Sequence, residues 1–292
     1  MENLSASYFL QVIVNGFYFG SWLMLASLGL TLLFGVAHIF NLAHGEFYML
    51  GGYGTWFFFA LHKINYWIAI LLSMFIVAVM GIGVERYIFR RFRGNLLPTI
   101  AVCSGLILIF DNTVTAVFGT VYKSIPSVFR GSLLFWGARI SIEKTAIILA
   151  SLLLTSLAIL FIFYTKPGSA IRAVAEDQEG AALQGISVNK VCALTMVIGS
   201  SLAAGAGGLV GPVYSISAEM GLPILLKGSI AIALGGMGSI GGVLIASYII
   251  GMVESFSATF LGAEISSMIL FLTLMVILMV KPTGLRGYTS QH

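Results

Sequence analysis

Long uncharged stretches constrain the fold of this chain more than any other feature. A helix needs about 20 predominantly apolar residues to cross the hydrocarbon core of a bilayer, and several stretches reach that length. The uncharged stretches, of which 47–62, 96–110 and 265–280 are shorter, are residues 3–45, 47–62, 65–84, 96–110, 145–164, 191–218, 228–253 and 265–280. Only 9% of the residues are charged, against about a quarter in a soluble domain. These observations predict an all-α polytopic membrane protein, and no alternating segments of the kind found in a β-barrel occur.

The apolar runs predict about 8–10 transmembrane helices, with nine crossings as the central count. Glu2 stands where a signal peptide would be basic, so the N-terminus is predicted to begin the first membrane helix. The other predicted helices are placed by the ends of the uncharged runs, and a Gly-rich segment divides the run after residue 213 into two pieces. The helices with predicted bounds are about 8–36, 46–62, 66–84, 97–118, 145–164, 190–212 and 265–280.

Basic residues predict the orientation, because Lys and Arg concentrate in cytoplasmic loops. Three segments are assigned to the cytoplasm: the cluster Arg86, Arg90, Arg91 and Arg93, the stretch 166–190, and the C-terminal tail with Lys281 and Arg286. Residues 119–144 then lie outside, although this loop is itself basic, and Pro126 and its aromatic residues suit a structured hairpin. The N-terminus is predicted outside, and the C-terminus is predicted in the cytoplasm.

The whole chain, residues 1–292, is predicted to be a single transmembrane domain. Two half-repeats are predicted at 1–118 and 145–280, because each contains an apolar segment interrupted by polar or small residues. The external loop 119–144 and the cytoplasmic loop 165–190 lie between predicted membrane helices.

The first interruption, HIFNLAHGEFYMLGGYG at 38–54, carries the most polar cluster within an apolar stretch: Asn41, His44 and Glu46. Ionisable groups inside a membrane usually face a cavity or a partner, which makes these residues candidates for lining a transport pathway. The alternative is a capped helix break, in which Asn41 or His44 satisfies free backbone groups and Glu46 lies in the positive first turn of a helix. Both interpretations remain open at this point.

The second interruption, ALGGMGSIGG at 233–242, is rich in glycine. Irregular backbone at membrane depth is tolerated where it is buried in protein or lines a cavity. Gly235, Gly236 and Gly238 are therefore further pathway candidates, although glycines also serve close helix packing.

The stretch AVAEDQEGAALQG, residues 173–185, is the least apolar part of the region between two membrane helices. Ser169 and Asp177 can cap two short helices, and Gly185 is placed where a left-handed helix stop is expected. A cytoplasmic helix-turn-helix is predicted, and the alternative is an ordinary solvated loop. The charged residues expected to be available to a partner are Arg172, Glu176, Asp177 and Glu179.

Within this stretch, Glu179, Gly180, Ala181 and Gly185 resemble the Glu-Ala-Ala-x-x-x-Gly loop of ABC importer permeases, with Gly180 where alanine is usual. Residues 15–53, 168–191 and 225–247 also resemble, in the same order, the shorter permease subunit of the branched-chain amino acid importers. The resemblance implies that the loop is a coupling helix seated in an ATPase subunit. It also implies a second permease subunit, two cytoplasmic ATPase subunits and a soluble or lipid-anchored solute-binding protein outside.

The resemblance implies a transport subunit rather than an enzyme. The chain has no Gly-x-x-x-x-Gly-Lys-Ser/Thr phosphate-binding loop, so ATP and Mg are expected on the partner subunits, and no catalytic residue, cofactor, metal site or nucleic acid is expected here. One alternative is a permease for another small polar solute, such as urea, an amide or a sugar. Another is an ion-coupled secondary transporter, which would depend on membrane acids such as Glu46, Asp111 or Glu254. An ion pair between Lys227 and an acid is also conceivable from the sequence.

Overall fold

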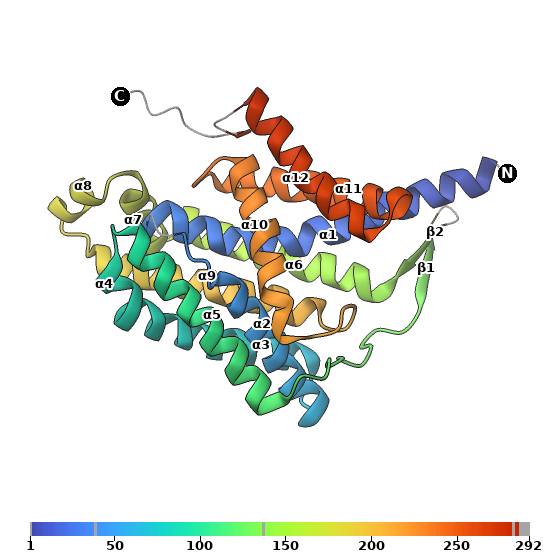
Figure 1. Cartoon of the computed structure of the whole chain (residues 1–292), viewed down its shortest axis with the longest axis horizontal. Helices are drawn as coiled ribbons and strands as arrows, with labels where there is room; N and C mark the ends of the chain where they lie inside the picture. The colour runs from blue at the N-terminus through green and yellow to red at the C-terminus, as the bar shows by residue number, and fades with distance from the viewer. Residues whose placement is uncertain (1, 38–39, 136–137, 282–283, 286–292) are drawn as a thin grey trace.

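The computed structural model describes residues 2–37, 40–135, 138–281 and 284–285. Helices make up nearly all of its regular structure, and one short hairpin interrupts them (Figure 1). The first half contains α1 (Glu2–Ala37), α2 (His44–Trp56), η1 (Phe57–Leu61), α3 (Tyr66–Val84), η2 (Glu85–Phe89), α4 (Arg90–Phe92) and α5 (Leu96–Phe118). The second half contains β1 (Ser132–Phe135), β2 (Ala138–Ser141), α6 (Ile142–Tyr164), α7 (Lys166–Glu176), α8 (Gln178–Leu183), α9 (Val188–Val210), η3 (Ala218–Met220), α10 (Gly221–Gly235), α11 (Ile240–Leu261) and α12 (Ala263–Val280).

Seven helical segments in the described residues are long and apolar enough to cross a membrane. They include α1, α3, α5, α6, α9, α10 and α11. The segments predicted at 46–62 and 265–280 are also helical, but α2 and the apolar part of α12 are shorter. The prediction of an all-α polytopic membrane protein with broken helices is therefore confirmed.

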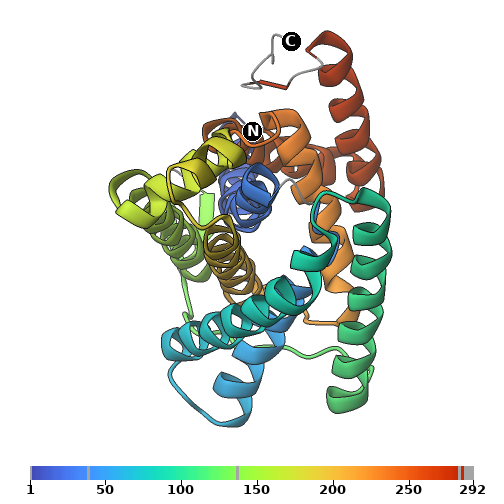
Figure 2. The same cartoon turned by 90° about the vertical axis from the view of Figure 1, so that its left-hand side faces the viewer.

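Two helices form the interior of the bundle. α1 packs along α11 and α9, and α9 packs along α2 and α3. In Figure 2, α5, α10 and α12 lie on one side of α1, and α6 and α7 lie on the other. Most of α1 and α9 is buried. By contrast, only 17% of the most apolar 18-residue stretch of α5 is buried within this chain.

Small residues allow the central helices to approach closely. A side chain at Gly199 on α9 would lie 2.9 Å from the Gly29 carbonyl oxygen of α1. A side chain at Gly51 on α2 would collide with the backbone of Ala204 on α9. Small residues on α1, α2 and α9 therefore serve tight helix packing, as helices in a membrane require.

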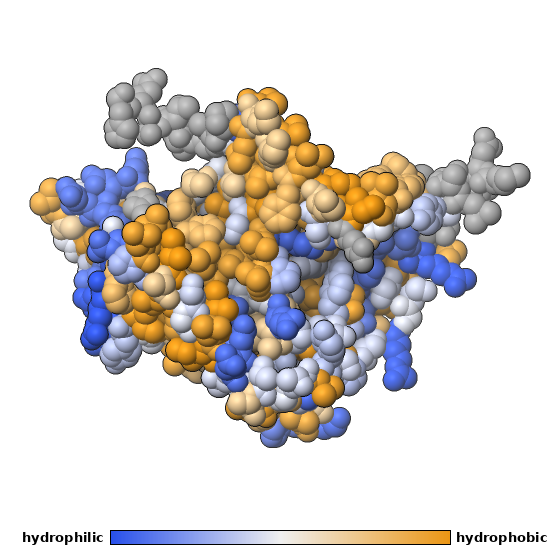
Figure 3. All heavy atoms as spheres, in the orientation of Figure 1, coloured by the Kyte–Doolittle hydropathy of each residue, from blue (hydrophilic) through white to orange (hydrophobic). Residues whose placement is uncertain are grey.

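The two ends of the bundle carry different structures. In Figure 1, α4, α7 and α8 lie at one end, whereas the β1–β2 hairpin and the N-terminal part of α1 lie at the other. The strands are antiparallel, with Leu133 opposite Ile140, so the hairpin predicted within 119–144 is present. Hydrophilic residues gather at both ends in Figure 3, and hydrophobic residues dominate the band between them. The basic cluster of α4 thus lies at the same end as the predicted coupling segment.

Candidate functional site

The first helix break follows the end of α1 and is closed by polar side chains. The Asn41 Oδ1 atom accepts a hydrogen bond from the Ala43 backbone N–H at 3.0 Å. His44 Nε2 lies 3.1 Å from the Ala26 carbonyl oxygen of α1, so this nitrogen donates. Asn41 and His44 are both buried. The His44 contact fixes the start of α2 against the middle of α1, and the Asn41 contact orders the backbone just before that start.

Glu46 follows in the first turn of α2 and is buried. Its carboxyl group lies close to the carboxyl group of Asp111 on α5. The Glu46 Oε2 atom is buried without a partner among the described residues. Asn41 and His44 therefore hydrogen-bond to free backbone groups, which is one of the two roles that the sequence left open. Glu46 instead makes a contact between helices.

A second interruption of the helices meets the first one. α9 ends at Val210 and α10 begins at Gly221, and a side chain at Gly221 would lie 2.7 Å from Glu46 Oε1. The segment that contacts the first break is thus 211–221. Its apparent counterpart in the sequence, 233–242, lies elsewhere in the fold.

The Gly-rich segment 233–242 forms the turn between α10 and α11. Gly236 and Gly238 have positive φ angles of 101° and 82°, which glycine adopts without steric strain. Ser239 caps α11 through a hydrogen bond from the Gly242 N–H at 3.2 Å. A side chain at Gly35, near the end of α1, would lie 3.4 Å from Gly238 Cα. Gly238 therefore lies beside the last turns of α1, whereas a side chain at Gly235 would meet Gly242 and Val243 of α11.

The charged stretch forms two short helices, as predicted. The first cap differs from the prediction: Thr165 Oγ1, not Ser169, accepts from the backbone N–H of Gly168 at 3.1 Å, so α7 begins four residues earlier than a Ser169 cap would allow. Asp177 Oδ1 accepts from the Glu179 N–H at 3.0 Å and caps α8. Gly185 has φ +82°. The Ile186 N–H reaches back to the Ala181 carbonyl at 3.0 Å, which closes the helix as a left-handed stop does.

The two faces of α7–α8 differ in burial. Ile171, Val174 and Ala181 are buried against the bundle. Arg172 is also turned inward, because it donates to the Ile162 carbonyl at 2.8 Å, and it is therefore engaged within the chain rather than available to a partner. The exposed side chains include Lys166 at the start of α7, and Glu176, Asp177, Glu179 and Leu183 around α8.

Gly180 stands where the resembling permeases carry alanine, and the local geometry gives the reason. A side chain at Gly180 would collide with the Asp177 carboxylate, which folds back to cap α8. Glycine at this position thus accommodates the cap without changing the spacing of Glu179 and Gly185.

α8 is tied directly to the membrane helices. The Gln178 Nε2 atom donates to the Val36 carbonyl oxygen at 2.8 Å. Val36 is in the last turn of α1, immediately before the segment that leads to Asn41. A displacement of α8 would therefore act on the end of α1.

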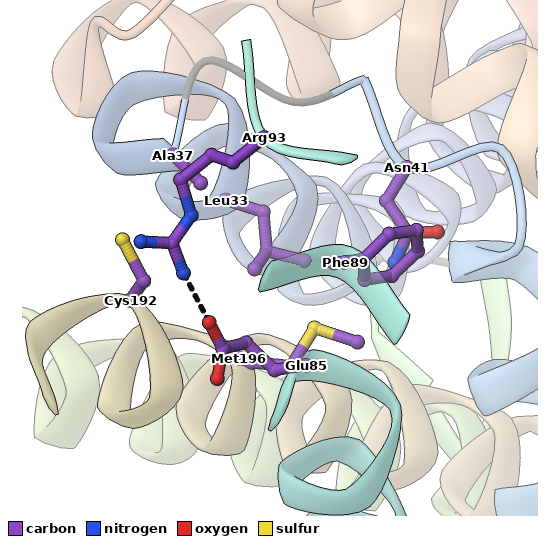
Figure 4. A pocket seen from close by; sticks show the side chains of 8 residues that line it. All are labelled: Leu33, Ala37, Asn41, Glu85, Phe89, Arg93, Cys192 and Met196. Carbon is purple, nitrogen blue, oxygen red and sulfur yellow. Dashed lines mark hydrogen bonds and ion pairs between the residues drawn. The ribbon is translucent and has the colours of Figure 1, made fainter. Parts of the chain in front are cut away.

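A pocket lies between α1, the segment after α3, and α9 (Figure 4). Its volume is about 10 Å³, enough for about one water molecule. Figure 4 shows Arg93 reaching across the pocket to Glu85. The two side chains form an ion pair. Arg93 also donates to Asn189 Oδ1 at 3.0 Å. The lining residues are Leu33, Ala37, Asn41, Glu85, Phe89, Arg93, Cys192 and Met196.

Sequence reasoning identified Arg93 only as part of a basic cluster. One signal could have found its partner: Glu85 is the only acid close to that cluster in the sequence. Glu85 begins the π-helical segment η2, a geometry that is often found at functional sites. The Arg93 contacts join this segment to the first turn of α9, directly after the α7–α8 segment.

Comparisons with known proteins agree with this architecture. Residues 12–279 match the family described as branched-chain amino acid transport system / permease component. The high-affinity branched-chain amino acid transport system permease protein LivH of Salmonella typhimurium is 33% identical, over 96% of each chain. The corresponding protein BraD of Pseudomonas aeruginosa is 32% identical, also over 96% of each chain.

Solved structures share the fold at lower sequence identity. PsaBC from Streptococcus pneumoniae, in complex with Fab, matches with a TM-score of 0.50 and 14% identity, over 96% of this chain and 94% of that one. A metal-chelate type ABC transporter in an inward-facing conformation matches with a TM-score of 0.50 and 15% identity, over 93% of this chain and 85% of that one. From the family match over nearly the whole length and the curated relatives above 30% identity, the chain belongs to the branched-chain amino acid ABC transporter permease family.

Proposed function

We propose that this chain forms part of the translocation pathway of an ATP-driven importer of branched-chain amino acids in the bacterial inner membrane. ATP would be hydrolysed by separate subunits, and a second permease subunit and an external binding protein would complete the assembly. The observation that carries the proposal is the α7–α8 segment. It exposes three acids and Leu183, whose side chain is 87% exposed, while its other face packs on the bundle.

The composition of the exposed face supports docking to a protein rather than to lipid. A helix that lies on a membrane surface presents Lys or Arg beside large apolar residues. Here three exposed acids, Glu176, Asp177 and Glu179, lie in α8 or directly before it. An exposed leucine on a segment that also exposes polar side chains suits an interface anchor with a polar border. We therefore place this end of the bundle in the cytoplasm, against an ATPase subunit.

Three contacts offer a physical route from α8 to the helix break. Gln178 binds the Val36 carbonyl at the end of α1. Arg172 binds the Ile162 carbonyl at the end of α6, and Arg93 joins the start of α9 to η2. α1 and α9 also border the two breaks that meet at Gly45 and Gly221. Movement of the docked ATPase would thus shift both helices whose interruptions face each other.

The Glu46–Asp111 contact is the proposed point at which this movement changes the pathway. Glu46 is on α2, Asp111 is on the sparsely packed α5, and Gly221 opens α10 beside them. In Figure 3, hydrophilic residues interrupt the apolar band near the middle of the face that shows α10. A polar surface within that band is unsuited to lipid and supports a water-accessible pathway on this side of the bundle.

Paired substitutions at the break separate its structural residues from its functional one. Asn41→Ala removes the hydrogen bond to the Ala43 N–H and is expected to cost about 1 kcal/mol of stability, as the loss of a helix cap does. Glu46→Gln preserves size and hydrogen bonding, and is expected to leave the melting temperature unchanged while uptake falls several-fold. Thermal unfolding in detergent and leucine uptake in proteoliposomes measure the two effects. Normal uptake by Glu46→Gln would restrict Glu46 to a structural role.

Affinity purification of the tagged chain from native membranes in mild detergent tests the proposed assembly. Two ATPase subunits, a longer permease and a binding protein are expected to co-purify. Leu183→Asp is expected to release the ATPase subunits but retain the second permease, because Leu183 lies on the exposed face of α8. Lys63→Met, in an exposed loop before α3, serves as the control. Recovery of the chain without any ATPase would contradict the proposal.

A further inference from the structure

An ion pair between α10 and α11 lies inside the bundle. Lys227 Nζ on α10 lies 2.8 Å from Glu254 Oε1 on α11. The two residues fall within candidate membrane spans, residues 218–235 and 240–261. The Lys227 ammonium also lies 4.8 Å from the centre of the Phe19 ring on α1. Charges at membrane depth are rare and commonly mark a substrate or ion route.

The pair is incompletely satisfied within the chain. An ammonium group has three donors, and among the described residues Lys227 hydrogen-bonds only Glu254. Glu254 Oε2 is buried without a partner among those residues. The side chains nevertheless keep 20% and 15% of their surface exposed. One acceptor and two donors therefore remain at a place that is partly open.

Structural stability does not account for such a pair. Replacing a buried ion pair with apolar residues of similar size is often neutral or stabilising, because desolvation offsets the attraction. The surroundings also connect the pair to the second break. Burial, and secondarily the Glu254 carboxylate, raise the pKa of Tyr214, a residue between α9 and α10. Lys227 also lies on α10 six residues after Gly221, the residue that meets Glu46.

We propose that Lys227 and Glu254 form a subsite for the charged end of a zwitterionic α-amino acid. The spare donors of Lys227 would bind the substrate carboxylate, and Glu254 Oε2 would accept from the substrate ammonium. Phe19 would lie beside the bound charges. This inference rests on the proposed function, since it concerns an amino acid importer. When the subsite is empty, the two side chains neutralise each other, so neither charge is left uncompensated in the membrane.

This arrangement predicts recognition of both charges together. A ligand with a carboxylate alone would leave Glu254 Oε2 unpaired and facing a like charge. A ligand with an ammonium alone would face Lys227. Hydrogen bonds to charged groups are worth enough that loss of one is expected to weaken binding about tenfold or more.

The test uses the whole complex with its partner subunits, reconstituted in nanodiscs and in proteoliposomes. Radiolabelled leucine binding is measured in nanodiscs without the binding protein, with unlabelled leucine, 4-methylpentanoate or 3-methylbutylamine as competitors. Leucine is expected to displace the label at least about tenfold more effectively than either singly charged analogue. The double variant K227M/E254Q removes both charges but keeps side-chain size. It is expected to lose this discrimination and to lower uptake about tenfold per assembled complex.

Lys63→Met is the matched lysine control and is expected to bind and import leucine as the wild type does. If the wild-type complex imports leucine and K227M/E254Q binds and imports it equally well, the subsite is overturned while the proposed function stays intact. Equal competition by leucine and the singly charged analogues would also overturn it. If the wild-type complex imports no amino acid in the presence of its binding protein and ATP, the proposed function is contradicted, and the subsite with it.

Discussion

Glu179→Arg is expected to abolish ATP-driven uptake while the chain still folds and inserts. The side chain is exposed on α8, so reversing its charge disturbs no buried contact. At a docked interface the same change places a like charge against the partner's basic groups, and disruption of a close interfacial charge pair costs about 2–5 kcal/mol. Affinity for the ATPase is therefore expected to fall about 30-fold or more. Leucine uptake in proteoliposomes and co-purification of the ATPase measure the effect.

A control and a second variant keep this prediction specific to the α7–α8 segment. Lys63→Glu also reverses an exposed charge, but outside that segment, and is expected to leave uptake unchanged. Gly185→Pro should uncouple transport as Glu179→Arg does, because proline cannot adopt the φ of +82° that closes α8. Normal uptake by both Glu179→Arg and Gly185→Pro would remove the coupling role from this segment.

Gly51→Ala is expected to destabilise the bundle. The added carbon would collide with the backbone of Ala204 on α9, and backbone cannot move aside as a flexible side chain can. Overpacking of this kind costs about 1–3 kcal/mol, so the melting temperature in detergent is expected to fall by about 2–10 °C.

Gly105→Ala on α5 is the matched helical control. A side chain there meets nothing within 4 Å, and alanine favours a helix over glycine. The melting temperature of this variant is expected to stay constant or to rise. Equal behaviour of Gly51→Ala and Gly105→Ala would contradict the close α2–α9 contact.

Helix positions were predictable because apolar run length and local caps encode them. α3 begins and ends at the predicted residues 66 and 84. Asn65 caps its start, and the charged Glu85 follows its end. Asp177 and Gly185 also act as their residue types indicate. Ser169 was wrong as a cap because Thr165 stands earlier and directly after the membrane helix. A sequence with two suitable caps does not reveal which one is used.

Contacts between distant segments were not predictable in the same way. Nothing in residues 38–54 reveals that they meet residue 221, because the pairing depends on how α1, α2, α9 and α10 pack. The Gly-rich 233–242 was the more conspicuous counterpart in sequence, yet it forms a turn beside Gly35. Arg172 was expected to be available to a partner, but the end of α6 captures it. The possible Lys227–acid pair was recognised, while Glu254 as its partner came only from the fold.

ATP-dependent leucine uptake by the reconstituted complex tests the central claim most directly. The complex of this chain, a second permease, ATPase subunits and binding protein is placed in proteoliposomes, with ATP on the ATPase side and no ion gradient. The account predicts uptake that requires ATP and binding protein and disappears with Glu179→Arg. Uptake by this chain alone, driven by an ion gradient without ATP, would contradict it and identify the membrane acids Glu46, Asp111 and Glu254 as ion-coupling groups.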